Sequence, residues 1–348
     1  CLDASGERDR IADSHARHFA DYVEELDRER GAEQAQAFAA FEREHDNIRI
    51  ALQYGVKQRH AELVLRLAAA TGWFWFVRGH WTDGRRWLTE ALALATGGSA
   101  VRGKALMTAG ILAEQQREPD VAVGIYTECL ELRRALGDEA GMGAALNNLA
   151  SVALNREDYE SAQNLYRESL AISRGAGDDE GVASALCNLG EIALVTRDYR
   201  GALAFFEESL TAARKLEHGW GCALVLGNLG DVRIELGELH AGVAALAEAL
   251  QIYGELSSPA GAAATLDRLA GALAHAGKGA TAARLLGAAD AVRGPTRGGL
   301  NSPDRDNVQS LLAEMLDSQL LVTLMAEGGE MFDLDTAVTY GLEAARSA

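Results

Sequence analysis

The stretch Leu146-Asn-Asn-Leu-Ala150 returns three more times along the chain, at a step of forty residues. The later copies are Leu186-Cys-Asn-Leu-Gly190, Leu226-Gly-Asn-Leu-Gly230 and Leu266-Asp-Arg-Leu-Ala270. Self-similarity at a fixed period of about 20 to 50 residues is the signature of a repeat architecture. One supersecondary unit, used several times, therefore decides the fold.

Each copy carries further small and large residues at fixed distances from this stretch. A small residue follows Ala150 after twelve positions, a large one after four more, and another small one after three more: Ala162, Tyr166 and Ser169. Small residues let two helices approach while the large side chain fills the space beside them, so each copy is predicted to be a helical hairpin. Extending this register backwards gives six copies in all.

Short polar segments interrupt the apolar periodicity inside the copies and predict the turn between the two helices. These segments are Arg156-Glu-Asp-Tyr159, Arg197-Asp-Tyr199 and Gly237-Glu-Leu239. A single hairpin cannot bury its apolar face alone. Stability is therefore expected to come from stacking of neighbouring copies.

The small–large–small order with its Leu-x-x-Leu-Gly opening resembles the tetratricopeptide (TPR) repeat, across roughly residues 65 to 293. The copies are longer than the usual family repeat and lack its closing proline, as Arg174 and Arg214 show, and longer second helices explain both departures. The resemblance implies an all-α fold, a right-handed α-α superhelix (TPR solenoid) with helical caps at both ends. We expect a cap over 1–60, six hairpins over 61–293 and a second cap over 294–348.

The two predicted caps show helical patterns of their own. Two patterns within residues 11–57 are parted by Gly31, and a Gly-rich loop from Arg297 to Pro303 precedes two more helices, at 304–327 and 333–346. Asp333 suits an N-cap. Terminal units with one polar face are what a solenoid needs at its ends.

Composition and charge exclude several functional classes. With 33 basic and 51 acidic residues the net charge is −18, which repels nucleic-acid phosphates, so direct contact with nucleic acid is not expected. No apolar run approaches the roughly 20 residues of a membrane span. The four cysteines are far apart with no CxxC spacing, which fits a reducing cytoplasm better than a disulfide framework.

Several further sequence motifs point to a more particular resemblance. They are His18-Phe-Ala-Asp-Tyr22, Glu44-His-Asp-Asn-Ile-Arg-Ile-Ala-Leu52, Gly72-Trp-Phe-Trp75, Gly84-Arg-Arg-Trp-Leu88 and Arg284-Leu-Leu-Gly-Ala-Ala289. Together they resemble the C-terminal sensor region of actinobacterial STAND-class regulatory ATPases, which include SARP-type and LuxR-type transcriptional regulators. The resemblance implies a non-enzymatic sensor, with an ATPase domain upstream if the chain is part of a longer protein. The alternative is a stand-alone TPR scaffold without a signalling role.

The chemistry of catalysis and of cofactor binding is missing from the sequence. None of the four lysines stands in a P-loop context, and there is no Gly-x-Ser-x-Gly elbow or Cys/His constellation. His15 and His18 are three residues apart on one predicted helix, but no third metal ligand is near in sequence. We therefore expect no enzyme activity, cofactor or metal.

A ladder of polar residues is the candidate binding site. Asn148, Asn188 and Asn228 occupy the same place in three consecutive first helices, with Arg268 in the fourth. The TPR resemblance implies that this place faces the concave groove, where Asn amides can hold the backbone of an extended peptide, a protein or a small effector. The predicted flanking residues, of which the acids favour a basic partner, are Ser151, Glu191, Asp231 and Glu235. The alternative is that these Asn residues hydrogen-bond neighbouring helices and stiffen the stack.

Four tryptophans gather near the first copy: Trp73, Trp75, Trp81 and Trp87. An aromatic cage for a small hydrophobic effector is one interpretation. Core packing is favoured, because Trp75 and Trp81 fall where other copies place packing residues.

Overall fold

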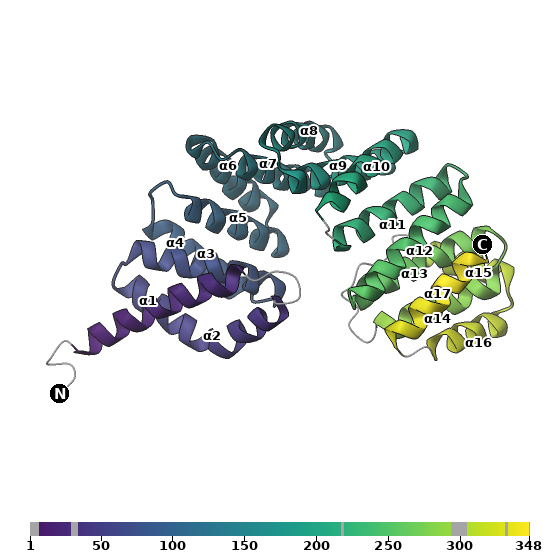
Figure 1. Cartoon of the computed structure of the whole chain (residues 1–348), viewed down its shortest axis with the longest axis horizontal. Coiled ribbons are helices and arrows are strands. Elements are labelled where there is room, and N and C mark those ends of the chain that lie inside the picture. The colour runs from purple at the N-terminus through teal and green to yellow at the C-terminus, as the bar shows by residue number, and fades with distance from the viewer. Residues whose placement is uncertain (1–6, 29–33, 217–218, 294–304, 331–332, 348) are drawn as a thin grey trace. The chain divides into compact units, whose positions relative to one another are not determined.

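The computed structural model describes residues 7–28, 34–216, 219–293, 305–330 and 333–347. All regular elements among these residues are α-helices (Figure 1), so the predicted all-α repeat fold is confirmed. Gly31 and the Gly-rich stretch from Arg297 to Pro303 lie outside the described residues. The chain divides into two compact units, Cys1–Ala176 and Gly177–Ala348.

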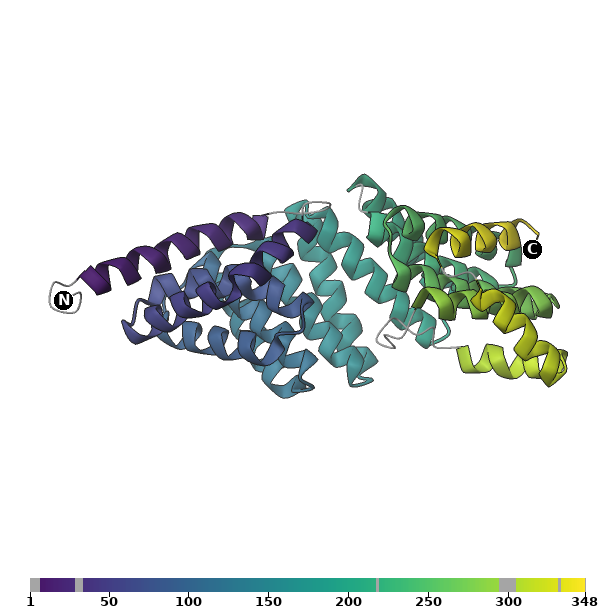
Figure 2. The same cartoon turned by 90° about the horizontal axis from the view of Figure 1, so that it is seen from below.

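The first unit pairs its helices as consecutive hairpins, α3 with α4, α5 with α6 and α7 with α8, and α1 packs on α2 and α3 (Figures 1 and 2). Its helices are α1 (Glu7–Arg28), α2 (Gln34–Lys57), α3 (Ala61–Val77), α4 (Trp81–Leu94), α5 (Ala100–Gln115), α6 (Pro119–Leu136), α7 (Glu139–Asn155) and α8 (Tyr159–Ala176). The first helices of successive hairpins also touch, α3 with α5 and α5 with α7. This is the stacking that the forty-residue register predicts.

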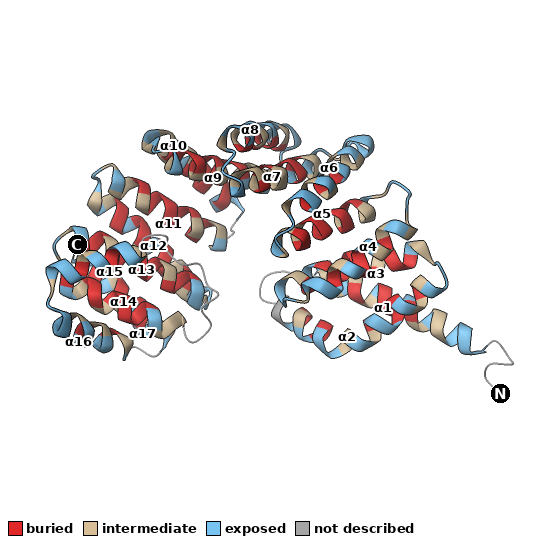
Figure 3. Ribbon diagram, turned by 180° about the vertical axis from the view of Figure 1, so that it is seen from behind, coloured by how far each residue is buried: buried red, intermediate tan, exposed pale blue. Residues whose placement is uncertain are grey.

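The second unit continues the hairpins, α9 with α10, α11 with α12 and α13 with α14, and then closes with three shorter helices. Its helices are α9 (Asp179–Val195), α10 (Tyr199–Lys215), α11 (Gly219–Glu235), α12 (Leu239–Glu255), α13 (Pro259–His275), α14 (Gly279–Arg293), α15 (Arg305–Met315), α16 (Ser318–Gly329) and α17 (Leu334–Arg346). Helix α16 packs on α14, and α17 packs on α12, α13 and α14. Buried residues line the faces where these helices meet (Figure 3).

The backbone repeats its turn geometry in every hairpin. A residue with a left-handed backbone, φ from +59° to +80°, stands between the two helices of each hairpin: Gly79, Arg117, Glu157, Arg197, Gly237 and Gly277. A positive φ tightens the connection so that the second helix folds back on the first. The predicted turns at 156–159, 197–199 and 237–239 are therefore confirmed.

The small and large residues of the register meet as predicted. A Cβ added at Gly190 would lie 2.6 Å from the Phe206 ring, and one added at Gly230 would lie 2.6 Å from the Leu246 side chain. The last small residue also donates a hydrogen bond to a carbonyl oxygen of the first helix in the same hairpin: Cys129 to Gly103 at 3.4 Å, Ser169 to Gly143 at 2.8 Å and Ser209 to Ala183 at 2.8 Å. These bonds fix how far the two helices slide along one another.

An arginine fastens α1 to the first hairpin. Arg66 of α3 donates to both carboxylate oxygens of Glu24 at 2.8 Å and to Asp21 at 2.7 Å. The hydrogen bond from Arg66 lowers the pKa of Glu24. Both partners are less than one-third exposed, at 28% and 29% of their side-chain surface.

This arginine gives the docking of α1 a dependence on pH. A lowered pKa in the folded state means that the stabilisation is present above the ordinary Glu value and is lost as the pH falls through the lowered value. We expect Arg66→Met to weaken α1 docking by about 1–2 kcal/mol at pH 7, and this effect should shrink as the pH falls below the ordinary Glu value. Hydrogen exchange of the α1 amides, corrected for intrinsic rates, measures this. The control is Arg17→Met, because the ion pair of Arg17 is with Asp13 on α1 itself. A difference between the two variants that did not shrink as the pH fell below the ordinary Glu value would contradict the assignment.

The C-terminal cap differs from the prediction at one point. The sequence pattern predicts a single helix over 304–327, but the structure has two, α15 and α16. Asp317 causes the break, because its side chain accepts a hydrogen bond from the Leu320 amide and so begins a new helix. Asp333 caps α17 in the same way, accepting from the Thr336 amide at 2.8 Å, as predicted.

Among the helices of the described segments, none combines the length and the apolar character that crossing a membrane requires.

Candidate functional site

The predicted ladder divides between the two units, with Asn148 on α7 and the other three positions on α9, α11 and α13. In the first unit Asn148 is half-buried, and its amide donates to Met107 Sδ on α5 at 2.8 Å. Ser151, one turn further along α7, lies 2.9 Å from the Tyr166 hydroxyl of α8. Both polar groups contact neighbouring helices of their own unit.

In the second unit a hydrogen-bonded cluster replaces a simple row of amides. Asn228 is only 6% exposed. Its carbonyl oxygen accepts from Arg268 of α13 at 3.2 Å, and its amide donates to Cys187 Sγ of α9 at 3.9 Å. Arg268 also pairs with Asp231 of α11 at 3.3 Å. Asn228 thus links three consecutive first helices, and Asn188 lies half-buried on α9 next to this cluster.

A missing side chain makes room for this arginine. A Cβ added at Gly227 would overlap Nη1 of Arg268. In the fourth copy of the repeated motif, residues 266–270, Arg268 replaces the Asn of the other three copies. In the third copy, residues 226–230, Gly227 stands where the first two copies have Asn147 and Cys187. The two departures are complementary, and only the structure shows that they are.

The carboxylates around the cluster differ in their surroundings. Burial raises the pKa of Glu191, while the Asn228 amide and the charge of Arg268 oppose the rise. Glu235 is exposed at the end of α11 and accepts a hydrogen bond from Tyr199, whose pKa rises as a result. With Asp231 paired to Arg268, this face of the unit carries an excess of acid.

A small cavity lies on the same side of α9, two turns before Glu191, and sequence reasoning missed it. It holds about 100 Å³ between α9, α10 and α11. We call it the α9–α11 pocket; its lining includes Ala183, Ser184, Cys187, Ala213, Trp220 and Leu224. Trp220 is 46% exposed although it is the largest apolar residue of α11. The signal in the sequence was Trp220, a large aromatic residue on the same predicted helix as Asn228.

The tryptophans of the first copy separate into two groups. Trp75 and Trp87 are buried at 1% and 4% exposure, which is core packing. Trp73 and Trp81 are 40% and 36% exposed, and Trp81 donates to the Phe76 carbonyl at 3.0 Å. The four residues therefore do not form one cage.

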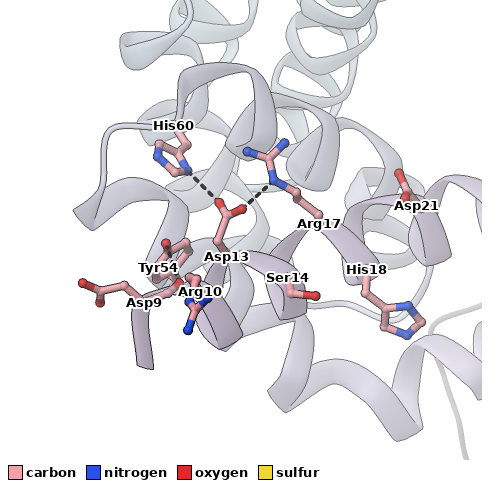
Figure 4. A pocket seen from close by; sticks show the side chains of 9 residues that line it. All are labelled: Asp9, Arg10, Asp13, Ser14, Arg17, His18, Asp21, Tyr54 and His60. Carbon is pink, nitrogen blue, oxygen red and sulfur yellow. Dashed lines mark hydrogen bonds and ion pairs between the residues drawn. The ribbon is translucent and has the colours of Figure 1, made fainter. Parts of the chain in front are cut away.

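An open hollow of about 730 Å³ lies along α1 in the first unit (Figure 4). Among the residues that line it, Asp13 accepts a hydrogen bond from Arg17 at 2.7 Å and lies 3.5 Å from His60. The hydrogen bond from Arg17 lowers the pKa of Asp13. Charges of both signs on an open surface favour no single ligand class.

No group of three or more His, Cys, Asp or Glu side chains able to hold a metal occurs in the described part of the chain. His15 and His18 instead contact the Phe19 ring, with centroids 4.7 and 5.2 Å away. Burial raises the pKa of the Cys187 thiol to about 12, which keeps it protonated near neutral pH and so a poor nucleophile.

Comparison with known proteins identifies the repeat. A tetratricopeptide repeat family matches residues 141–215, the span of helices α7 to α10. Among curated proteins, none matches this sequence.

Solved structures of similar fold cover larger parts of the chain. A Rap protein complexed with competence and sporulation factor has a TM-score of 0.53 at 15% identity, over 95% of this chain and 98% of its own. NprR in complex with its cognate peptide NprX has a TM-score of 0.52 at 15% identity, over 69% of this chain and 67% of its own. BtubC from P. vanneervenii has a TM-score of 0.51 at 21% identity, over 66% and 93%. At these identities the likeness concerns the fold.

Proposed function

We propose that this chain is a non-enzymatic binding module that holds a peptide or protein segment on the exposed faces of its first helices. The observation that carries the proposal is the face of α9 and α11 in the second unit. Within that unit α9 packs only on α10 and α11, and α11 only on α9, α10, α12 and α13. The face that carries Ser184, Asn188, Glu191 and Trp220 is covered by no other described helix of the unit.

The residues on this face have the chemistry of a peptide-binding surface. Asn188 lies half-buried on this face, Glu191 and Glu235 offer charge, and Trp220 offers apolar area. The fold is that of Rap and NprR, two structures that each contain a peptide or protein factor, which supports a ligand of the same class here. Asn228 and Arg268 serve this surface indirectly, because their hydrogen bonds hold α9, α11 and α13 in line.

We further propose that the module is the sensor of a STAND-type ATP-dependent transcriptional regulator in the cytoplasm. The support is the set of sequence words that resembles the sensor region of that class. The second candidate is a stand-alone scaffold. The complete gene decides between them: a P-loop domain encoded directly upstream supports the sensor, and a start codon near Cys1 supports the scaffold.

Site-specific photo-crosslinking tests the binding surface. We expect benzoylphenylalanine at Ser184, on the open face of α9, to cross-link a discrete partner in native extract, identified by mass spectrometry. The matched control is Ala204, which is exposed on the second helix α10 of the same hairpin. We expect at least tenfold less of the same adduct from position 204. Equal yields from both positions would contradict the proposal.

A further inference from the structure

We infer that the α9–α11 pocket takes one branched aliphatic side chain of a basic peptide, and that Glu180 and Glu191 contact basic residues of that peptide. This inference rests on the proposed function and adds the chemical class of the ligand.

The side chains that line the pocket favour an apolar ligand group. Ala183, Ala213, Leu224 and Val225 present hydrocarbon to it. Ser209 also lines it, but its hydroxyl is already engaged with the Ala183 carbonyl at 2.8 Å. Cys187 adds a neutral thiol. The other polar residues of the lining, Glu180 and Ser184, are exposed. A polar ligand group that entered between the apolar walls would therefore lose its hydration without gaining a partner from them.

The size of the pocket selects a single side chain. A volume of about 100 Å³ corresponds to roughly three water molecules of liquid volume, which is room for the few carbons of a Val, Leu or Ile side chain and not for an indole. Trp220 lines the same pocket and keeps 46% of its surface exposed. A partly exposed Trp beside a small apolar pocket is typical of the residues that dominate binding energy at interfaces.

The acidic residues around the pocket indicate that the peptide residues next to the aliphatic side chain are basic. Glu180 lines the pocket and is exposed, and Glu191 lies one turn beyond Cys187 on the same helix. Each of the nearby cations already has an acidic partner: Lys215 lies 3.8 Å from Asp179, Arg214 pairs with Glu248 at 2.5 Å, and Arg268 pairs with Asp231 at 3.3 Å. A peptide with Lys or Arg beside its aliphatic residue therefore complements this face, within a chain of net charge −18.

Selection from a phage-displayed library of random linear decapeptides on the purified chain tests the inference. We expect enrichment of sequences with Val, Leu or Ile next to Lys or Arg. Changing the aliphatic residue of a selected peptide to Ala should weaken binding at least tenfold by fluorescence anisotropy.

Protein variants separate the pocket from the rest of the surface. Ser184→Leu adds bulk at the exposed rim of the pocket and should weaken the aliphatic peptide at least tenfold, and Glu180→Arg should reverse the charge preference of the selection. Ala204→Leu, on an exposed position of α10 outside the pocket, should change neither. Selected peptides that cross-link to position 188 but lack the aliphatic residue and ignore Ser184→Leu would overturn the inference and leave the proposed function standing. Failure to enrich any peptide would overturn both.

Discussion

Asp267→Ala is expected to loosen α15 from α13 and α14 and to lower the stability of the second unit by about 3–5 kcal/mol. Asp267 on α13 is 1% exposed, and its two carboxylate oxygens pair with Arg293 at the end of α14 and with Arg305 at the start of α15. Both arginines are nearly buried, at 10% and 14% exposure. Removing the carboxylate leaves two nearly buried guanidinium groups close together without their counter-charge. An uncompensated buried charge destabilises the folded state strongly.

The same network contains its own control. Asp290 also pairs with Arg305, at 2.7 Å, and with Arg293, at 3.1 Å, but it is 51% exposed. Water therefore compensates for its loss, and Asp290→Ala should cost at most about 1 kcal/mol. Urea denaturation with hydrogen exchange of the α15 amides measures both variants. Similar losses for Asp267→Ala and Asp290→Ala would show that burial does not set the strength of this network.

The sequence predicted the repeat well because its signals are local and recur. The small–large pairs such as Gly190 with Phe206, and the turn at Arg197, depend on positions within one hairpin, so their spacing is visible along the chain. The break between α15 and α16 was not predicted because one Asp N-cap inside an apolar period is a weak signal. The register identified positions 169 and 209 as places where a small residue lets two helices approach. It did not indicate that Ser169 and Ser209 also donate hydrogen bonds between those helices.

The candidate site was harder to predict because its properties depend on contacts between hairpins. Asn148, Asn188 and Asn228 occupy equivalent positions in the sequence repeat. Only at Asn228 does an arginine of the next first helix, Arg268, extend over the Gly227 backbone and donate a hydrogen bond to the Asn side chain. Asn228 has the contacts of a residue that fixes neighbouring helices. Ligand contact by Asn188 and Glu191 stays a prediction. The α9–α11 pocket involves three helices and has no short motif at all.

Gly328→Ala should lower the stability of the C-terminal cap by about 2–3 kcal/mol, although it adds a single methyl group. Helices α14 and α16 cross so closely that a Cβ at Gly328 would overlap the Arg284 carbonyl oxygen, and one at Gly287 would overlap the Met325 carbonyl oxygen. Backbone atoms cannot move aside as the end of a flexible side chain can, so the two helices must separate and lose their shared contacts.

Gly329→Ala is the matched control for this crossing. It adds the same methyl group one residue later, where the nearest atom, the Gly287 carbonyl oxygen, would be 3.9 Å away. Ala favours helix over Gly, so this variant should be neutral or gain up to about 1 kcal/mol. Thermal unfolding and hydrogen exchange of the α16 amides compare the two variants. If Gly328→Ala were as stable as Gly329→Ala, the close crossing of α14 and α16 would be wrong, and a cap held by side-chain packing would have to take its place.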